Sequence, residues 1–231
     1  MITWTELRSA DQPEAWVART IAGALADAIA RRGQALAALC GGSTPRTSYR
    51  ALNREPVDWS RVTLTLTDER WVPPQDELSN EGMLRDALLR QSAAAARFVG
   101  LWSGAATAAE AARVANDAIG FLARPFDLTL LGMGEDGHFA SLFPGAAGTA
   151  DALRPDNESL VVAIEPAAAA SRLSMTLSCL RQSRRILLLV SGQRKRQVLE
   201  RARSALNPQQ LPVAALLHAD APGIEIIWVN T

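Results

Sequence analysis

Cysteine and histidine are scarce in this sequence of 231 residues. There are two cysteines, Cys40 and Cys179, and two histidines, His138 and His218. Two cysteines cannot build the disulfide framework of a small secreted protein, and residues so widely separated do not form a zinc-ligand set. We therefore expect a cytoplasmic protein with reduced thiols and no metal ion.

Excess charge of either sign is also absent. Lysine plus arginine and aspartate plus glutamate number 24 each, so the formal net charge is zero. Without a basic excess there is no global attraction to nucleic acid or to an anionic membrane. No apolar run is long enough to span a bilayer, and the first residues lack the basic flank and apolar core of an export signal. We expect no nucleic-acid or membrane partner, and a monomer or weak homodimer.

Lysine is almost missing from the basic residues. Lys195 is the only lysine among the 24 lysine and arginine side chains. A chain that uses arginine nearly everywhere a cation is wanted either needs a compact ammonium group at that place or retains one lysine by chance. Composition by itself leaves both interpretations open.

Apolar segments typical of buried strands alternate with helical patterns along the whole sequence. The predicted strands are Ile2–Leu7, Ala35–Cys40, Val62–Thr67, Phe126–Leu131, Ser159–Ile164, Arg185–Val190 and Ile224–Val229. Amphipathic segments such as Asp11–Arg32 and Glu81–Arg90 predict helices between them. This alternation predicts an α/β fold with a doubly wound, mostly parallel, Rossmann-like sheet and helices on both faces. No repeat or linker divides it, so we expect one domain over residues 1–231.

The central stretch is residues 126–144, which read FDLTLLGMGEDGHFASLFP. The apolar start suits a strand buried on both faces. Glycines then allow a sharp turn, and Asp136 and His138 follow two residues apart. In open α/β sheets, ligands bind just beyond the carboxyl ends of strands. The sequence therefore predicts that this pair lies in a ligand site.

Two less specific interpretations of this loop need weighing. Gly132, Gly134 and Gly137 match GxGxxG, but no acidic ribose-binding residue follows in a suitable strand, so we expect no dinucleotide cofactor. His138 is either a structural histidine with satisfied hydrogen bonds or a residue that takes part in the chemistry of the site. Its place between glycines after a buried strand favours the chemical role.

Other glycine turns and charged segments also follow predicted strands. After Ala35–Cys40 come Gly41, Gly42, Ser43, Thr44 and Pro45, a sequence that suits a phosphate-binding nest at a helix N-terminus. A helix cap formed by Ser43 or Thr44 is the simpler interpretation, and it is compatible with the first. Lys195 falls in the first turn of a helix after a similar junction, Ser191-Gly192.

Asp68, Glu69 and Arg70 follow the predicted strand Val62–Thr67. They indicate either a solvated loop or an ion-paired cluster that faces a cleft. Ser79 and Asn80 then precede a predicted helix and are plausible caps for it.

Several of these motifs together resemble one family. The loop GMGEDGHFASLFP resembles the signature of the 6-phosphogluconolactonases, and TDERWV at residues 67–72 with Ser79-Asn80 resembles a second motif. The Gly41 turn, the segment from Arg172 and the Gly-x-x-Lys that ends at Lys195 are similar to further family motifs. The related glucosamine-6-phosphate deaminases share the fold but carry an acidic residue where this chain has Phe143. The resemblance therefore favours the lactonase.

The resemblance implies hydrolysis of 6-phospho-D-glucono-1,5-lactone in the oxidative pentose phosphate pathway, with a phosphorylated sugar lactone as substrate and no cofactor. His138 is then the general base on a water molecule, Asp136 orients it or raises its basicity, and Arg70 holds the substrate or developing charge. The implied binding residues are Gly41, Gly42, Ser43, Thr44, Asp68, Glu69, Asn80, Gly134, Arg172 and Lys195. The alternatives are a sugar-phosphate isomerase or deaminase, and a non-catalytic effector domain that binds sugar phosphates.

Overall fold

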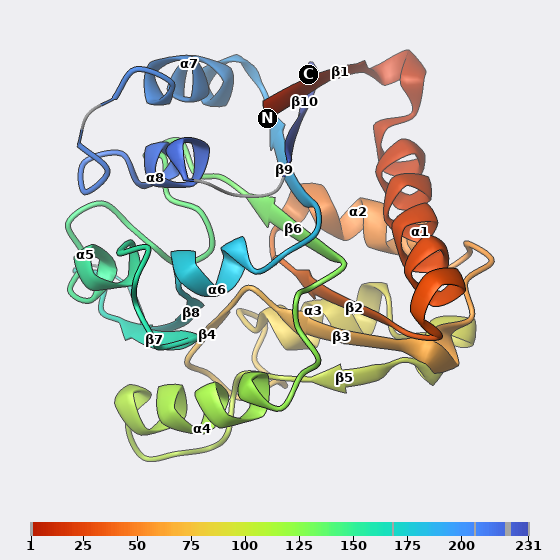
Figure 1. Ribbon diagram of the computed structural model, residues 1–231, viewed down its shortest axis with the longest axis horizontal. Coiled ribbons are helices and arrows are strands. Elements are labelled where there is room, and N and C mark those ends of the chain that lie inside the picture. Colours follow the sequence, from red (N-terminus) through yellow and green to blue (C-terminus); the bar gives the residue numbers. More distant parts are fainter. Residues whose placement is uncertain (1, 168, 206, 220–222, 231) are drawn as a thin grey trace.

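The computed structural model, described over residues 2–167, 169–205, 207–219 and 223–230, is built on a seven-stranded sheet (Figure 1). Its strand order is β1-β10-β9-β6-β2-β3-β5, and every neighbouring pair is parallel. The strands are β1 (Ile2–Arg8), β2 (Ala35–Leu39), β3 (Val62–Leu66), β5 (Arg97–Val99), β6 (Leu128–Gly132), β9 (Ile186–Ser191) and β10 (Ile224–Asn230). The predicted fold class, a doubly wound and mostly parallel sheet, is confirmed.

The strand order creates a switch point between β2 and β6. From β2 the chain proceeds outward to β3 and β5, and it then returns to the other side of β2 as β6 and continues to β9 and β10. The connection that follows β2 and the connection that follows β6 leave the sheet in opposite directions. The space between them, above the carboxyl ends of the strands, is where open α/β sheets bind ligands. The turns that follow β2 and β6 therefore face each other across the predicted site.

Helices cover both faces of the sheet. α1 and α2 lie on one side, and α7 and α8 lie on the other (Figure 1). The helices are α1 (Pro13–Arg32), α2 (Ser43–Leu52), α3 (Asn80–Ala87), α4 (Ala108–Gly120), α5 (Thr149–Ala152), α6 (Leu177–Arg181), α7 (Gln193–Ala202) and α8 (Pro212–His218). Short 3₁₀ turns span Ser9–Asp11, Trp59–Arg61 and Gln91–Ala95. β2, with the sequence ALAAL, is buried along its whole length. A strand that is covered on both faces has apolar residues at every position, and β2 therefore contains no polar residue.

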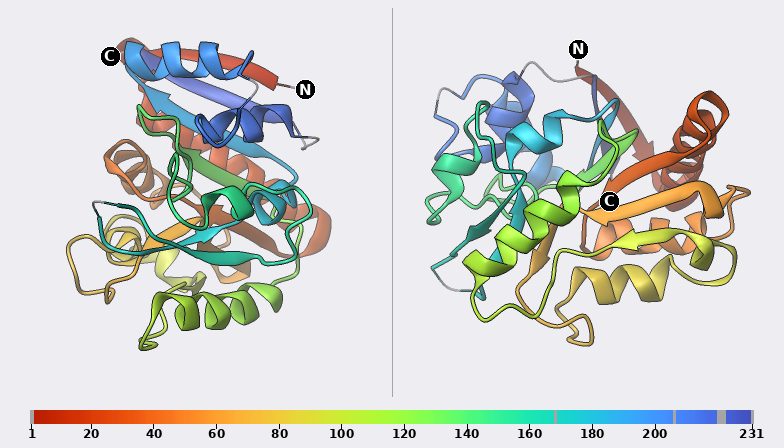
Figure 2. Two further views of the ribbon diagram at one scale, coloured as in Figure 1. Left: turned by 90° about the vertical axis from the view of Figure 1, so that its left-hand side faces the viewer. Right: turned by 60° about the horizontal axis from the view of Figure 1, so that its bottom comes forward.

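A second, antiparallel sheet stands beside the first. It contains β4 (Asp68–Arg70), β8 (Arg172–Met175) and β7 (Val161–Ile164), in that order. The expectation that Ser159–Ile164 belongs with the parallel strands is therefore wrong, and residues 68–70 form a strand rather than a loop. α4 packs on β7 and covers this sheet (Figure 2). The antiparallel register sets Arg70 directly opposite Arg172.

Smaller differences concern short elements. The segment 145–158, which follows the central stretch, contains the single turn α5. β5 and α8 had no clear pattern in the sequence. Along the described ranges, no helix combines the length and the apolar character needed to cross a membrane.

Candidate active site

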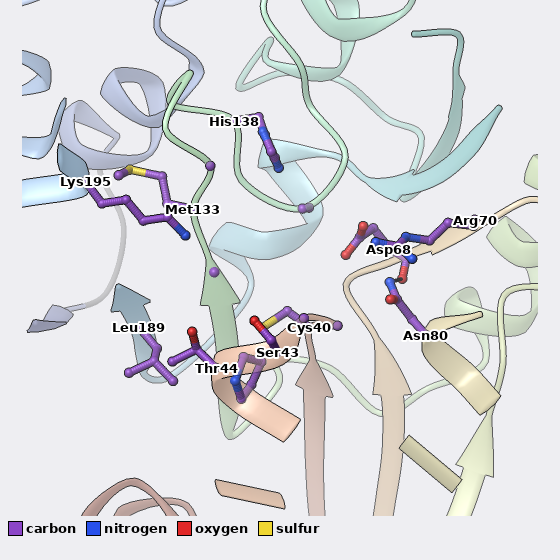
Figure 3. A pocket seen from close by; sticks show the side chains of 16 residues that line it. Cys40, Ser43, Thr44, Asp68, Arg70, Asn80, Met133, His138, Leu189 and Lys195 are labelled. Atoms are coloured by element: carbon purple, nitrogen blue, oxygen red, sulfur yellow. Dashed lines mark hydrogen bonds between the residues drawn. The ribbon is translucent and has the colours of Figure 1, made fainter. Parts of the chain in front are cut away.

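A cavity opens above the carboxyl ends of the strands at the switch point, between the turn after β2 and the turn after β6 (Figure 3). His138 points toward its centre, with Ser43 and Thr44 on the opposite wall. Lys195 lies on one flank, and Asp68, Arg70 and Asn80 lie on the other (Figure 3). The residues predicted from sequence that line it are Gly41, Gly42, Ser43, Thr44, Asp68, Arg70, Asn80, Gly134, His138 and Lys195. Tertiary folding thus brings together segments that are far apart in the chain.

His138 and Asp136 form a hydrogen-bonded pair on the loop after β6. The distance from His138 Nδ1 to Asp136 Oδ1 is 2.6 Å, and the His138 backbone N–H donates to the same oxygen at 3.2 Å. The Gly134 N–H donates to the His138 carbonyl at 2.9 Å and closes the turn. With Nδ1 directed at the carboxylate, Nε2 is the ring nitrogen left to face the cavity (Figure 3).

The charge of Asp136 is stabilised in this arrangement. Partial burial acts to raise the pKa of Asp136, but the hydrogen bond from His138 and the attraction between the two groups outweigh it, so that the pKa is lowered. An ionised Asp136 accepts a hydrogen bond from the N–H at Nδ1 of His138. In a neutral imidazole with its proton on Nδ1, the free lone pair is on Nε2. The pair is thereby set up for His138 to accept a proton from a molecule in the cavity.

Two glycines allow side chains to come close to the backbone of this site. A Cβ atom on Gly134 would lie 2.3 Å from both Cε1 and Nδ1 of His138. A Cβ atom on Gly41 would lie 1.9 Å from Oδ1 of Asn80. Both distances are far below van der Waals contact, so a larger residue at either place must displace the functional group beside it.

Asp68 is a nearly buried carboxylate in the cavity wall, with 7% of its surface exposed. Its Oδ2 accepts a hydrogen bond from Ser141 Oγ at 2.7 Å, and its Oδ1 accepts one from Thr67 Oγ1 at 3.0 Å. Burial, with a further contribution from the charge of Asp68, raises the pKa of the Cys40 thiol to about 12. Cys40 lines the cavity but is protonated, and therefore it is not a nucleophile.

Glu69 was predicted to contact the ligand, and the structure corrects this. The side chain is fully buried and points away from the cavity wall toward the start of α3. Its two oxygens accept hydrogen bonds from the backbone N–H groups of Asn80 and Glu81, both at 2.7 Å, and from Ser79 Oγ at 3.0 Å. Burial raises the pKa of Glu69 although these hydrogen bonds oppose the shift. Glu69 therefore anchors α3, and with it Asn80, rather than facing a ligand.

The turn after β2 leads directly into α2. The helix begins at Ser43 after Gly42, whose φ of 116° requires glycine, and no side chain caps it. The proposed cap by Ser43 or Thr44 is therefore wrong, and the first N–H groups of α2 have no intrahelical partners. Those groups and the positive end of the helix dipole suit an anion. Lys195 stands in the first turn of α7, beyond Gly192, and lines the same cavity.

Three cations lie at or beside the cavity. Within the described part of the chain, Arg70, Arg172 and Lys195 form no ion pair; Arg70 donates instead to the carbonyl of Leu78. Arg172 does not line the cavity but lies across from Arg70 on β8. Burial, followed by repulsion from Arg70, lowers the pKa of Arg172, while Asp68 and Glu69 partly offset the shift. Like charges directly opposite each other in a sheet are unfavourable, so this pair favours a bound anion.

The sequence did not single out every residue that shapes the site. Ser141 was not among the predicted site residues, yet it links the loop of His138 to Asp68 and, through its backbone N–H, to Ser174 Oγ at 3.2 Å. No local pattern signals such a contact between distant segments. Among the residues that the structure describes, no three His, Cys, Asp or Glu side chains gather as a metal site.

Comparison with known proteins identifies a family that matches nearly the whole chain. Residues 8–228 match the model of the glucosamine-6-phosphate isomerases/6-phosphogluconolactonase. A 6-phosphogluconolactonase of Rhizobium meliloti (strain 1021) is 41% identical over 213 residues, which cover 92% of each chain. A 6-phosphogluconolactonase of Pseudomonas aeruginosa is 40% identical over 212 residues, which cover 91% of this chain and 89% of that relative.

Solved structures share the architecture. The structure of a 6-phosphogluconolactonase from Shewanella baltica OS155 superimposes with a TM-score of 0.94 at 33% identity, covering 99% of this chain and 98% of that one. A monomeric glucosamine-6-phosphate deaminase superimposes with a TM-score of 0.77 at 22% identity, covering 98% of this chain and 97% of that one. The second likeness concerns the fold alone.

Proposed function

This chain belongs to the glucosamine-6-phosphate isomerase/6-phosphogluconolactonase family, and from that premise we propose that it hydrolyses 6-phospho-D-glucono-1,5-lactone to 6-phospho-D-gluconate in the oxidative pentose phosphate pathway. The curated relatives named above are 6-phosphogluconolactonases. One observation in this chain carries the proposal: an imidazole backed by a carboxylate faces a cavity that Arg70 and Lys195 also line. We propose that residues 1–231 act as one domain.

The charge of the cavity suits this substrate and its product. A phosphate monoester carries nearly two negative charges at neutral pH, and hydrolysis of the lactone adds a carboxylate. Arg70, Arg172 and Lys195 supply three positive charges that no carboxylate of the described residues neutralises by direct contact. Charge-assisted hydrogen bonds to such cations are stronger than neutral ones, so the cavity favours a molecule with this charge.

We assign the phosphate to the flank with Lys195 and the turn Gly41–Thr44. The N–H groups at the start of α2 and the Lys195 ammonium group line this part of the cavity. Arg172 adds positive potential from its place beside Arg70 rather than by lining the cavity. This assignment leaves Arg70 for the reacting end of the substrate.

His138 then acts as the general base. Its Nε2 takes a proton from a water molecule while the water oxygen bonds to the lactone carbonyl carbon. The carbonyl oxygen becomes an oxyanion, which the Arg70 guanidinium stabilises. When the tetrahedral intermediate collapses, the bond from this carbon to the ring oxygen breaks. His138 returns its proton to the ring oxygen, and the new carboxylic acid ionises in water.

A covalent intermediate is not needed for this reaction. A lactone is an activated ester, so water with a base is a sufficient nucleophile. The Cys40 thiol is held protonated by burial, and the Ser141 hydroxyl, which donates to Asp68, is buried and does not line the cavity. Neither side chain is in the state that nucleophilic catalysis requires.

The experiment that tests the proposal is a coupled assay in which glucose-6-phosphate dehydrogenase generates fresh lactone and its decay is followed. We expect the wild-type protein to accelerate the decay over background, and His138→Asn to lower kcat by about 10²- to 10⁴-fold, the share typical of general-base catalysis. His218→Asn is the matched control, because His218 is exposed, lies outside the cavity lining and contacts the carbonyl of Arg203 at 3.1 Å. Decay at the background rate with wild-type protein contradicts the activity, and full turnover by His138→Asn contradicts the base assignment.

A further inference from the structure

One face of the His138 imidazole is covered by the ring of Phe143. The two ring centroids are 4.3 Å apart, and the planes are inclined by 43°. This separation is within the range of direct aromatic contact. Phe143 is half-buried and does not itself line the cavity. The two rings thus touch behind the nitrogen that faces the substrate site.

The hydrogen bond to Asp136 does not by itself define the ring orientation. The Asp136 side chain is 48% exposed, so water competes for its oxygens. A single bond through Nδ1 also lets the ring swing about the line from Nδ1 to Oδ1, which moves Nε2 out of line with a bound substrate. A contact on the ring face opposes that swing.

Phe143 is itself held in place. Its N–H donates to the Ser141 carbonyl at 3.2 Å, and its carbonyl accepts from the Ala146 N–H at 3.3 Å. Ser141 is tied in turn to Ser174 and to the carboxylate of Asp68. The ring therefore stands on a part of the loop that is fixed to the second sheet.

We propose that Phe143 is a positioning residue, which by contact with the ring face holds the His138 imidazole in the orientation that presents Nε2 to the cavity. This inference rests on the proposed function, because it takes His138 as the base. It extends that function by naming a second support for the ring, one without charge and independent of Asp136.

The charged groups around the imidazole define how a new charge at position 143 acts. Asp136 is on the same loop, while Asp68 of β4 and Lys195 of α7 face the cavity from other elements. Glu135 is paired with Arg194. A glutamate at position 143 brings a second carboxylate beside the ring, which favours the imidazolium.

Nuclear magnetic resonance tests the contact without any turnover, because the chain has only two histidines. His138→Asn assigns the imidazole ring protons of His138, and exposed His218 is the internal reference. We expect the Phe143 ring current to displace the His138 resonances, and Phe143→Leu to remove that displacement.

Kinetics test the positioning role. We expect Phe143→Ala to lower kcat about 10- to 100-fold, as small misplacements of a catalytic group do, with little change in KM. Phe143→Leu keeps an apolar contact and should recover much of kcat. Phe143→Glu should move the acidic limb of the kcat/KM profile to higher pH, because the protonated imidazole is not a base.

The proposal is overturned if Phe143→Ala retains wild-type kcat, or if the His138 resonances are the same in all variants at position 143. Neither result affects the proposed function as long as His138→Asn remains inactive. If His138→Asn is active, the base assignment fails while the resonance experiment still decides the contact. Should Phe143→Ala not fold, Phe143→Leu and Phe143→Glu carry both tests.

Discussion

At the scale of single residues, Lys195 is a cation that forms no ion pair with any residue the structure describes. Its neighbours Arg194 and Arg196 form ion pairs with Glu135, Glu6 and Glu200, whereas Lys195 itself faces the cavity. The one lysine of the chain is thus found at the site, which favours the functional interpretation of its retention over chance.

Replacing Lys195 should therefore weaken substrate binding more than it slows the reaction. We expect Lys195→Ala to raise KM about 10- to 100-fold, because a charge-assisted hydrogen bond to phosphate is lost, while kcat changes little. Steady-state kinetics with fresh lactone measure this. Lys195→Arg should keep part of the affinity, and Arg194→Ala, next to it on the exposed surface, should behave as the wild type. An unchanged KM in Lys195→Ala would place the phosphate elsewhere.

Three consecutive residues show how little sequence proximity says about side-chain direction. Asp68 and Arg70 line the cavity, while Glu69 between them is buried against α3. This is the alternation of a β-strand, in which neighbouring side chains point to opposite faces. The sequence treated residues 68–70 as one group, and the resemblance therefore assigned Glu69 to the ligand together with its two neighbours. Recognising β4 as a strand requires its partner β8, about a hundred residues further along the chain.

At the scale of elements, the loop after β6 requires a glycine at position 134, because the side chain of His138 packs directly against the backbone there. Gly134→Ala should lower kcat by roughly 100-fold, because the new Cβ, built 2.3 Å from the imidazole, displaces His138. Gly23→Ala in α1 is the matched control, since its Cβ meets nothing within 4 Å. It should leave kcat unchanged and raise the free energy of unfolding by about 0.5–1 kcal/mol.

Assay and thermal unfolding of both variants measure this prediction. Wild-type kcat in Gly134→Ala would show that the loop tolerates the side chain without moving the imidazole. Loss of kcat in Gly23→Ala would show that the assay responds to any change of glycine, and the contrast between the two positions would then lose its meaning.

At the scale of the whole molecule, the site is assembled from both sheets and from helices on both faces of the larger one. A ligand that joins the Lys195 flank to the Arg70 flank should therefore stabilise the fold as a whole. At 100 times its Kd, 6-phosphogluconate should add about 2.7 kcal/mol to the free energy of unfolding. That corresponds to a rise in Tm of roughly 5–10 °C for a chain of this size.

Thermal unfolding with added ligand measures this stabilisation. The increase should shrink as ionic strength rises, because exposed charges on the ligand and the cavity are screened. Gluconate, which lacks the phosphate, is the matched control and should give a much smaller shift at equal concentration. Equal shifts from both compounds would argue against a phosphate site.

The sequence by itself determined the parallel sheet and most of the residues in the cavity. The sheet and its glycine turns follow from local physics: buried strands have apolar runs, glycines mark the sharp turns after them, and parallel strands all present their carboxyl ends at one edge. His138, Lys195 and the Gly41–Thr44 turn were found for that reason. Asp68, Arg70 and Asn80 were instead assigned through the resemblance to the family.

Only the tertiary structure decided which of these residues face one another. The pairing of Arg70 with Arg172, the bond from Ser141 to Asp68 and the contact of Phe143 with His138 are set by strand register and by packing between loops. A side chain's direction changes with a one-residue shift of register, and no pattern within a single segment records that register.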